Sequence, residues 1–448
     1  MKTTVDFIHD LTFEELPAEV VEQAHICLLD LLGVAAAGHA TRLSRIMEQF
    51  VCSQYPGDHP LLFSKAKASA CGSALFGGML IDSIDAHDGQ VLTKGHVGVA
   101  ILPGLLAVAE ERELNGKEFL TALVVGYEIA TRAGIALHET ADDYHTSGAW
   151  NSIGVAAVAA RLQGLSAEQT WEALGTAEFY GPRSQMMRCI DHPTMIKDGS
   201  GWGALAGISS ALLAAAGFTG APAITLSTPE VTSIWSDLGR RWYIQEQYFK
   251  AYPVCRWAQP AVEAVRQIRA QHPLDVEQIA EVHIHSFHEA TRLHTVQPQT
   301  TEQAQYSLPF SVACALMDDV VTAQAVSETQ QGIYNSQRKA LSAKVISHED
   351  EIYNARFPAQ RWAHAVIKML DGSEYRSDPA IARGNPENPL SKAELTEKFE
   401  TLTADYLPTG VRDTIRKNSL SLEKLPPAGL KDFLKLLATP VNKTSPST

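Results

Sequence analysis

The sequence predicts a mainly α-helical protein with an α+β part, in which a large all-helical domain is built from both ends of the chain and a smaller α+β domain forms a lid. Three observations support this prediction. Apolar residues recur at helical spacing up to about residue 255, alternate with other residues as in strands between about 255 and 394, and then return to helical spacing. We therefore expect residues 1–254 and 395–448 to form the helical domain and residues 255–394 to form the lid.

Long apolar segments predict the helices of the first half. The first, PAEVVEQAHICLLDLLGVAAAG, begins with Pro17, which favours a helix start, and ends with Gly38. Three more are FLTALVVGYEIATRAGIAL, SIGVAAVAARLQGL and GALAGISSALLAAAGFTG. Small and apolar residues occupy several faces of these segments, whereas a surface helix would carry a polar face. We therefore expect these helices to be buried against one another.

The lid region carries strand and turn patterns. IAEVHIHSF alternates apolar with other residues, and RWAHAVIKMLDGSEYRS predicts a strand, an Asp-Gly turn and a second strand. The next stretch, RGNPENPLSKAELTEKF, is interrupted by Pro and Gly and then places Glu394 three residues after Ser391, which is the pattern of a helix capping box. From there the chain is expected to be helical again.

Composition and charge exclude several classes of protein. The 448 residues are 45% hydrophobic and 20% charged, as in an ordinary globular protein. The formal net charge of −14 argues against a nucleic-acid partner, which would require a basic surface. The N-terminal MKTTVDFIHDLTFEELP is too acidic and polar for a signal peptide, and runs such as GVAILPGLLAVA are shorter than the roughly 20 residues that span a bilayer. The six scattered cysteines are typical of reduced thiols, so we expect a cytoplasmic protein without a membrane or nucleic-acid partner.

The stretch IDSIDAHDGQVLTKGHVGVAILPG concentrates titratable residues between apolar segments. On a helix, Asp82 and Asp85 would share a face, as would Asp85 and Asp88, and clustered carboxylates raise one another's pKa. His96 lies just before an expected helix, whose dipole favours the neutral imidazole and therefore a general base. A solvated loop with helix-capping aspartates fits the same residues, so the pattern alone leaves both interpretations open.

Two further polar residues precede helices rich in small residues. His145 stands before the small-residue helix in DDYHTSGAWNSIGVAA, which leaves room for a ligand beside the ring, although a structural histidine fits equally. Lys197 in MIKDGSGWGALAG precedes its glycines, so this is not a phosphate-binding P-loop. A buried lysine needs a partner, and a bound carboxylate would supply it while the glycines keep the approach clear. A lysine that reaches solvent from a loop is the alternative.

Candidates near the expected domain junction are weaker. KAYPVCRWAQP holds Lys250, Cys255 and Arg256, and pockets concentrate at such junctions; simple burial is the favoured interpretation of the cysteine. His283 and His285 in HIHSFH could share a metal ion, but no nearby acid or cysteine completes a ligand set. We therefore expect no metal site.

Seven stretches, in order along nearly the whole chain, together resemble the MmgE/PrpD family, which includes 2-methylcitrate dehydratases, cis-aconitate decarboxylases and an iminodisuccinate epimerase. The stretches are DSIDAHD with GHVG, HTSGAWNSIGVAAVAARLQGLS, MIKDGSGWGALAG, GFTGAPA, YPVCRWAQPAVEA, AQYSLPFSVACAL and DGSEYRSDPAIARGNPENPLSKAELTEKF. The resemblance implies a helical domain with an α+β lid, usually a homodimer. It also implies cofactor-free chemistry on small di- and tricarboxylates at the domain junction.

The resemblance also assigns site residues. The residues expected to be catalytic are Asp85, His96, His145 and Lys197. Those expected to contact substrate are Arg256, His87, Gln259 and Tyr306. Several of these positions depart from the family pattern: His87 replaces an acid of DFDD, Gly89 replaces the threonine of the decarboxylases, Gln259 replaces a histidine after YPxCR, and Phe310 replaces a tyrosine, with Tyr306 four residues earlier on the same expected helix face.

The losses of the threonine, the histidine and the tyrosine argue against cis-aconitate decarboxylation. The sequence therefore predicts a cofactor-independent lyase, most similar to a 2-methylcitrate dehydratase, that removes a proton next to a carboxylate and expels water. An epimerase or isomerase of an aspartate- or succinate-like diacid is the first alternative. A carboxylate-binding protein that has lost activity is the alternative from another class.

Overall fold

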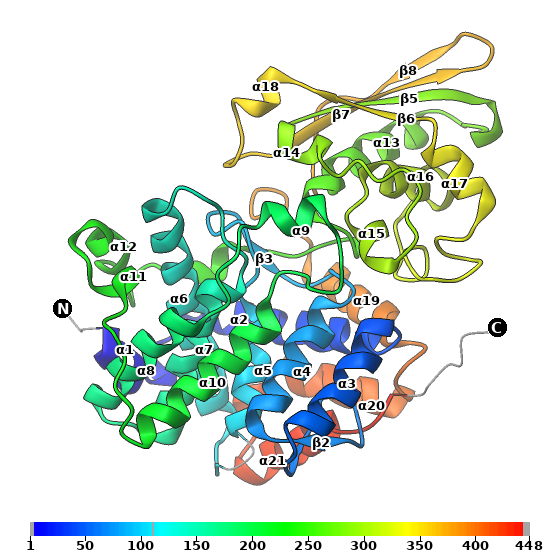
Figure 1. The fold of residues 1–448 in the computed structure, drawn as a ribbon. Coiled ribbons are helices and arrows are strands. Elements are labelled where there is room, and N and C mark those ends of the chain that lie inside the picture. Colours follow the sequence, from blue (N-terminus) through cyan, green and yellow to red (C-terminus); the bar gives the residue numbers. More distant parts are fainter. Residues whose placement is uncertain (1–3, 110–111, 442–448) are drawn as a thin grey trace.

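The structure is a computed structural model that describes residues 4–109 and 112–441 (Figure 1). Long helices form a large body, and a twisted sheet with shorter helices lies above it in the view of Figure 1. The helices before the sheet are α1 (Thr4–Asp10), α2 (Ala18–Gly38), α3 (Arg42–Gln54), α4 (Ala70–Asp82), α5 (Gly98–Ala109), α6 (Gly116–Thr140), α7 (Gly148–Gln163), α8 (Ala167–Tyr180), α9 (Met187–Asp191), α10 (Ser200–Ala215), α11 (Ile224–Ser227) and α12 (Thr232–Trp235).

The chain then builds the upper part and returns to the body. The upper helices are α13 (Gln259–Gln271), α14 (His288–Thr291), α15 (Thr301–Gln305), α16 (Leu308–Asp318), α17 (Ser336–Ser342) and α18 (Glu351–Asn354). The C-terminal helices of the body are α19 (Lys392–Thr403), α20 (Thr409–Ser419) and α21 (Pro427–Leu437). Short 3₁₀ helices lie at Phe13–Glu15, Pro229–Val231, Tyr243–Glu246, Arg256–Ala258, Val276–Gln278 and Leu422–Lys424.

The strands form one mixed sheet and two short ladders. The mixed sheet has the order β6-β5-β7-β8, with β9 also paired to β7. Its strands are β5 (Ile279–Ser286), β6 (Val345–Glu349), β7 (Trp362–Met369), β8 (Glu374–Arg376) and β9 (Ala380–Ile381). Strands β5 and β6 are parallel, and the other pairs are antiparallel. The ladders are β1 (His59–Pro60) with β2 (Lys67–Ala68), and β3 (Gly89–Gln90) with β4 (Gln247–Tyr248).

Two hydrophobic clusters follow the expected division between body and lid. The larger cluster takes its buried residues from positions 7–249 and 395–437, so both ends of the chain share one core. The smaller takes its residues from positions 186–380, because α9 packs against the lid. Helices α13 and α16 pack on one face of the mixed sheet (Figure 1). The mainly α fold with a smaller α+β part is confirmed, and the exact domain limits stay a prediction.

The local signals in the sequence mark the helix ends correctly. Helix α2 follows Pro17 and ends at Gly38, and Ser391 and Glu394 form both hydrogen bonds of the capping box of α19. Two helices, α2 and α6, are as long and apolar as membrane spans, but 83% and 100% of their apolar windows are buried inside the protein. They are therefore core helices of the body.

Candidate active site

A cavity with an empty volume of ≈390 Å³, including its opening to solvent, lies where the body meets the lid. The charged and phenolic residues that line it are Asp85, Lys94, His96, Asp198, Tyr248, Lys250, Arg256, Tyr306 and Arg361. A larger cavity of ≈780 Å³ lies between α4, α5 and α21 and is mostly apolar, and its charged lining residues within the described part of the chain are Arg112, Lys431 and Lys435. Catalysis needs converging titratable groups, so the smaller cavity is the candidate active site.

Asp85 and Lys250 form a buried ion pair beside this cavity. Helix α4 ends at Asp82, and the chain after it forms β3, which pairs with β4 just before Lys250. The Lys250 Nζ lies 2.8 Å from the Asp85 Oδ1 and also donates to the Asp85 carbonyl oxygen at 2.9 Å. Burial alone would raise the pKa of Asp85, but the charges of Lys250 and Lys197 hold it below its ordinary value. This carboxylate is therefore ionised and neutralised by lysine.

The prediction that Asp82 and Asp85 share a helix face is wrong, because Asp85 lies beyond the helix in a left-handed turn. Its φ is +52°, and Lys94 and Lys197 have φ values of +52° and +55°. Residues with side chains adopt this region rarely and at an energetic cost of about 1–3 kcal/mol each. Two of these residues, Asp85 and Lys94, line the cavity, so the surrounding fold holds their backbone in this conformation at the candidate site.

His96 has the tautomer of a general base. Its Nδ1 lies 2.6 Å from the Asp88 carbonyl oxygen, which can only accept, so Nδ1 carries the proton and Nε2 keeps the lone pair. The His96 backbone N–H donates to the Ser147 Oγ at 2.8 Å, and the Tyr127 hydroxyl holds the Asp88 carboxyl. Burial and the charge of Lys250 lower the pKa of His96 to about 3, against the opposing charge of Asp85. The ring is therefore neutral at pH 7.

Lys197 is buried and meets the lid. Its Nζ donates to the Gln305 Oε1 at 2.5 Å and lies 5.0 Å from the centre of the Tyr306 ring. The Gln305 Nε2 in turn donates to the Ser83 carbonyl oxygen at 2.9 Å, so this amide joins lid and body at the site. Among the described residues no carboxylate lies within ion-pair distance of the Lys197 ammonium, which leaves it available to a bound anion.

The expectation that the glycines near Lys197 keep its approach clear is wrong. A Cβ at Gly201 would lie 2.6 Å from the Met79 Cγ and 2.7 Å from the Leu75 carbonyl oxygen, and one at Gly203 would lie 2.9 Å from the Gly148 Cα. The glycines therefore let α10 pack tightly against α4 and α7. They fix the position of Lys197 through helix packing.

Two buried carboxyl groups close to Lys197 have raised pKa values. Burial raises the pKa of Asp82 to about 6 although Lys197 opposes the shift. Burial and the neighbouring Asp82 raise the pKa of Asp198 to about 7. Asp198 accepts hydrogen bonds from the Ser147 backbone N–H at 3.1 Å and from the Ser147 hydroxyl. Because Asp198 lines the cavity and is partly protonated near neutral pH, it is a candidate general acid.

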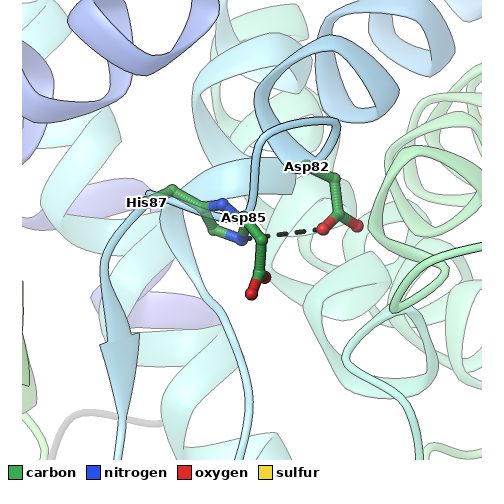
Figure 2. A group of neighbouring side chains, drawn as sticks. All are labelled: Asp82, Asp85 and His87. Carbon is green, nitrogen blue, oxygen red and sulfur yellow. Dashed lines mark ion pairs between the residues drawn. The ribbon is translucent and has the colours of Figure 1, made fainter. Parts of the chain in front are cut away.

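His87 lies behind the cavity and is fully buried. Its ring centre is 4.3 Å from that of His96, and its Nε2 is 3.9 Å from the Asp82 Oδ1 (Figure 2). Burial and the charges of His96 and Lys250 lower the pKa of His87 well below its ordinary value. The ligand atoms of Asp82, Asp85 and His87 lie within 4.8 Å of one another, close enough to consider a metal ion. Lys250 pairs with the Asp85 Oδ1, whereas the Asp82 Oδ1, the Asp85 Oδ2 and both ring nitrogens of His87 have no hydrogen-bond partner among the described residues, so the expectation of no metal site stays a prediction.

Two of the predicted residues, Gln259 and Arg256, have other surroundings than expected. The Gln259 side chain accepts from Arg256 at 2.9 Å and donates to the Tyr252 and Val254 carbonyl oxygens at 3.1 Å, so it holds the lid segment and does not line the cavity. The prediction that Gln259 contacts substrate is therefore not supported by its position. Arg256 lines the cavity, but Gln259, the Arg383 carbonyl oxygen and Asn385 occupy its donors.

His145 lies beside the cavity and is not among its lining residues. Its Nδ1 lies 3.0 Å from the Asp143 carbonyl oxygen, and its backbone N–H donates to the His138 Nε2 at 3.0 Å. A catalytic role of His145 stays a prediction.

Tyr306 does line the cavity, but it lies between α15 and α16, so the expectation that it shares a helix face with Phe310 is wrong.

Four residues of the site had no predicted role. Lys250 and Lys94 stand in stretches that the sequence singles out, but nothing in the spacing brings Lys250 to Asp85. Asp198 follows Lys197 directly, which is a usable signal for a shared site. Arg361 lies just before β7 and begins the stretch that predicts this strand, but that pattern assigns the side chain no role. Burial raises the pKa of Cys255 to about 12, so it is a thiol and not a nucleophile, as its favoured interpretation held.

Comparison with known proteins shows the family of the chain. Residues 2–231 match the MmgE/PrpD N-terminal domain, and residues 252–424 match the MmgE/PrpD C-terminal domain. The chain therefore belongs to the MmgE/PrpD family, whose members include lyases of small carboxylates. It is 24% identical to the cis-aconitate decarboxylases of Homo sapiens and Mus musculus, over 93% of this chain and 90% and 89% of those proteins. A cis-aconitate decarboxylase-like protein of Aspergillus oryzae is 26% identical over 38% of each chain.

Proposed function

We propose that this protein is a cofactor-independent hydro-lyase of the 2-methylcitrate dehydratase type, which removes a proton next to a carboxylate of a small di- or tricarboxylate and expels water. The observation that carries the proposal is the neutral His96 in a cavity that Lys250 also lines, together with the buried Lys197, which is not among the lining residues but places its ammonium 5.0 Å from the ring centre of the lining Tyr306. A carbanion next to a carboxylate needs a base for the proton and cations for the growing charge. This cavity offers both.

In the proposed reaction the His96 Nε2 takes the proton from the carbon next to a substrate carboxylate. The electron pair of the broken C–H bond then spreads onto that carboxylate, where Lys197 stabilises it. An imidazole of low pKa is a weak base, but a bound polycarboxylate raises its pKa because each negative charge favours the imidazolium. Protonated Asp198 gives its proton to the departing hydroxyl, so that a C=C bond forms and water leaves. His145 keeps its expected role in holding the carboxylate.

Decarboxylation is the second candidate, because the long relatives described above are cis-aconitate decarboxylases. In that reaction a C–C bond breaks, CO₂ leaves, and a protonated base donates to the carbon. One structural feature weighs against it. A Cβ at Gly89, where the resemblance places a threonine in the decarboxylases, would lie 2.4 Å from the Tyr248 hydroxyl oxygen. The Tyr248 ring therefore occupies the space that a side chain at this position needs.

The test is a mass-spectrometric screen of the purified protein against citrate, 2-methylcitrate, cis-aconitate and aspartate-derived diacids, with and without chelator. A product lighter by one water supports the hydro-lyase, and one lighter by CO₂ replaces it with the decarboxylase. Deuterium exchange from heavy water without an alkene product supports an epimerase instead. Tight binding without any product or exchange supports the binding protein. Inactivation by chelator overturns the cofactor-independent mechanism.

The expected homodimer and cytoplasmic location also stay predictions.

A further inference from the structure

Arg361 is a buried arginine that forms no ion pair with a carboxylate among residues 4–109 and 112–441. It is 6% exposed, its Nε and Nη2 have no hydrogen-bond partner among those residues, and its guanidinium lies 6.0 Å from the centre of the Phe357 ring. Three other buried arginines have polar partners: Arg132 pairs with Asp237, Arg338 pairs with Asp318, and Arg256 donates to the neutral groups described above. A buried charge that lacks a partner is costly, and proteins keep one where a ligand supplies the partner.

The position of Arg361 identifies where that ligand would bind. It stands just before β7 on the lid and lines the cavity that also holds His96. On the body side Lys94 lines the same cavity, and its Nζ lies over the Tyr144 ring, 4.2 Å from its centre. Lys94 and Arg361 thus line one cavity from the body and from the lid, and burial and the charge of Arg361 lower the pKa of Lys94. No carboxylate among the described residues forms an ion pair with Lys94.

We propose that Arg361 and Lys94 bind a second carboxylate of the substrate, remote from the carbon that reacts at His96. A guanidinium matches a carboxylate with two parallel hydrogen bonds, and a nearby ammonium adds a point charge. In the proposed reaction Lys197 stabilises the carboxylate next to the reacting carbon, while Lys250 is paired with Asp85, so two separate cationic sites select a substrate with at least two carboxylates. The identity of the reaction rests on the proposed function, but this binding inference does not require turnover.

The test compares the binding of citrate, succinate and propionate by calorimetry at pH 7. The quantity of interest is the ratio of the propionate Kd to the citrate Kd, because a loss of general electrostatic attraction would weaken all three acids together. We expect Arg361→Gln to lower this ratio at least about tenfold, and Arg361→Lys to lower it less, because a lysine keeps the charge and loses the two-pronged geometry. The control is Arg356→Gln, which removes the same charge from an exposed position in the same segment and should leave the ratio unchanged.

An unchanged ratio in Arg361→Gln overturns the inference, as does the absence of binding of all three acids to the wild-type protein. If Arg361→Gln does not fold, the ratio in Arg361→Lys decides in the same way. The inference and the proposed function fail separately. If Arg361→Gln lowers the ratio as expected but the wild-type protein turns over none of the acids of the mass-spectrometric screen, the hydro-lyase is refuted and the inferred carboxylate-binding site stands. If the wild-type protein turns over an acid of the screen but Arg361→Gln changes neither the Kd ratio nor the KM, the hydro-lyase is supported and the binding inference is refuted.

Discussion

The Asp85–Lys250 ion pair makes a sharp prediction, because stability and catalysis should respond differently to its removal. Both side chains are at most 2% exposed, and the charged atoms are 2.8 Å apart. At an effective dielectric of about 20, two charges at that distance attract by about 6 kcal/mol. Most of this attraction offsets the cost of taking two ions out of water. Removing one partner leaves the other charge buried and unpaired, so each single variant should lose about 3–5 kcal/mol of unfolding free energy.

The variants are Asp85→Asn, Lys250→Met and the double variant. Asparagine tolerates the left-handed backbone of position 85, so the turn is preserved. Because the double variant leaves no unpaired charge, it should be more stable than Lys250→Met alone, with a coupling of about 2 kcal/mol or more. Turnover should not recover with stability, because the ammonium that neutralises the site is gone.

Unfolding in urea, followed by far-UV circular dichroism, measures stability, and initial rates on the acid identified by the screen measure activity. The control is Lys392→Met, since the Lys392–Glu22 pair has a similar distance of 2.9 Å but is more than half exposed. That variant should lose less than about 1 kcal/mol. Additive losses in the double variant would refute the coupling. Wild-type turnover in the double variant would refute the catalytic role of the pair.

Three further predictions concern the same cavity. His96→Asn should lower kcat by a factor of about 10²–10⁴ and change citrate affinity by less than about tenfold, because the side chain moves a proton and is not the main anion contact. An unchanged kcat in steady-state assays would exclude His96 as the base. Citrate binding should take up protons at pH 7 and weaken as pH rises from 6 to 8, because a bound anion raises further the pKa of Asp198, already about 7. Calorimetry in two buffers of different ionisation enthalpy measures the uptake, which should fall in Asp198→Asn, and equal uptake in both proteins would contradict this. Gly89→Ala should lower stability by about 1–3 kcal/mol in thermal unfolding, because its Cβ would lie 2.4 Å from the Tyr248 hydroxyl; an unaltered melting curve would show that the ring can move freely.

The sequence predicts the helices and strands far better than it predicts the contacts between them. The ends of α2 at Pro17 and Gly38, and the capping box at Ser391, are local signals, and each is present in the structure. Strands β7 and β8 form the hairpin that the Asp-Gly turn between them predicts, and Gly372 in this turn has a φ of +87°. These features depend on a few neighbouring residues, so the sequence carries enough information to place them.

The site depends on contacts between distant parts of the chain. Lys250 meets Asp85 across 165 positions, and Lys197 meets Gln305 across 108. The left-handed turn at Asp85 is stabilised by the Lys250 contact, so helical spacing could not reveal it. The same is true of Arg361, whose strand pattern assigns the side chain no role and whose significance comes from its burial in the cavity without a carboxylate partner among the described residues. Resemblance found His96 and Lys197, and the structure was needed to add Lys250 and Asp198.

The charge of the cavity is opposite to that of the whole protein. The chain carries a net charge of −14, yet the lining residues include Lys94, Lys250, Arg256 and Arg361. Their carboxylate counterpart Asp85 is neutralised by its own lysine. Exposed charges more than about 8 Å away are screened at physiological ionic strength, whereas charges inside a buried cavity are not. An anionic substrate is therefore held by the lining cations at short range, and the acidic surface outside has little influence on its affinity. Body residues such as His96 and Lys250 and the lid residue Arg361 line this cavity together, so the intact cavity requires both parts of the chain.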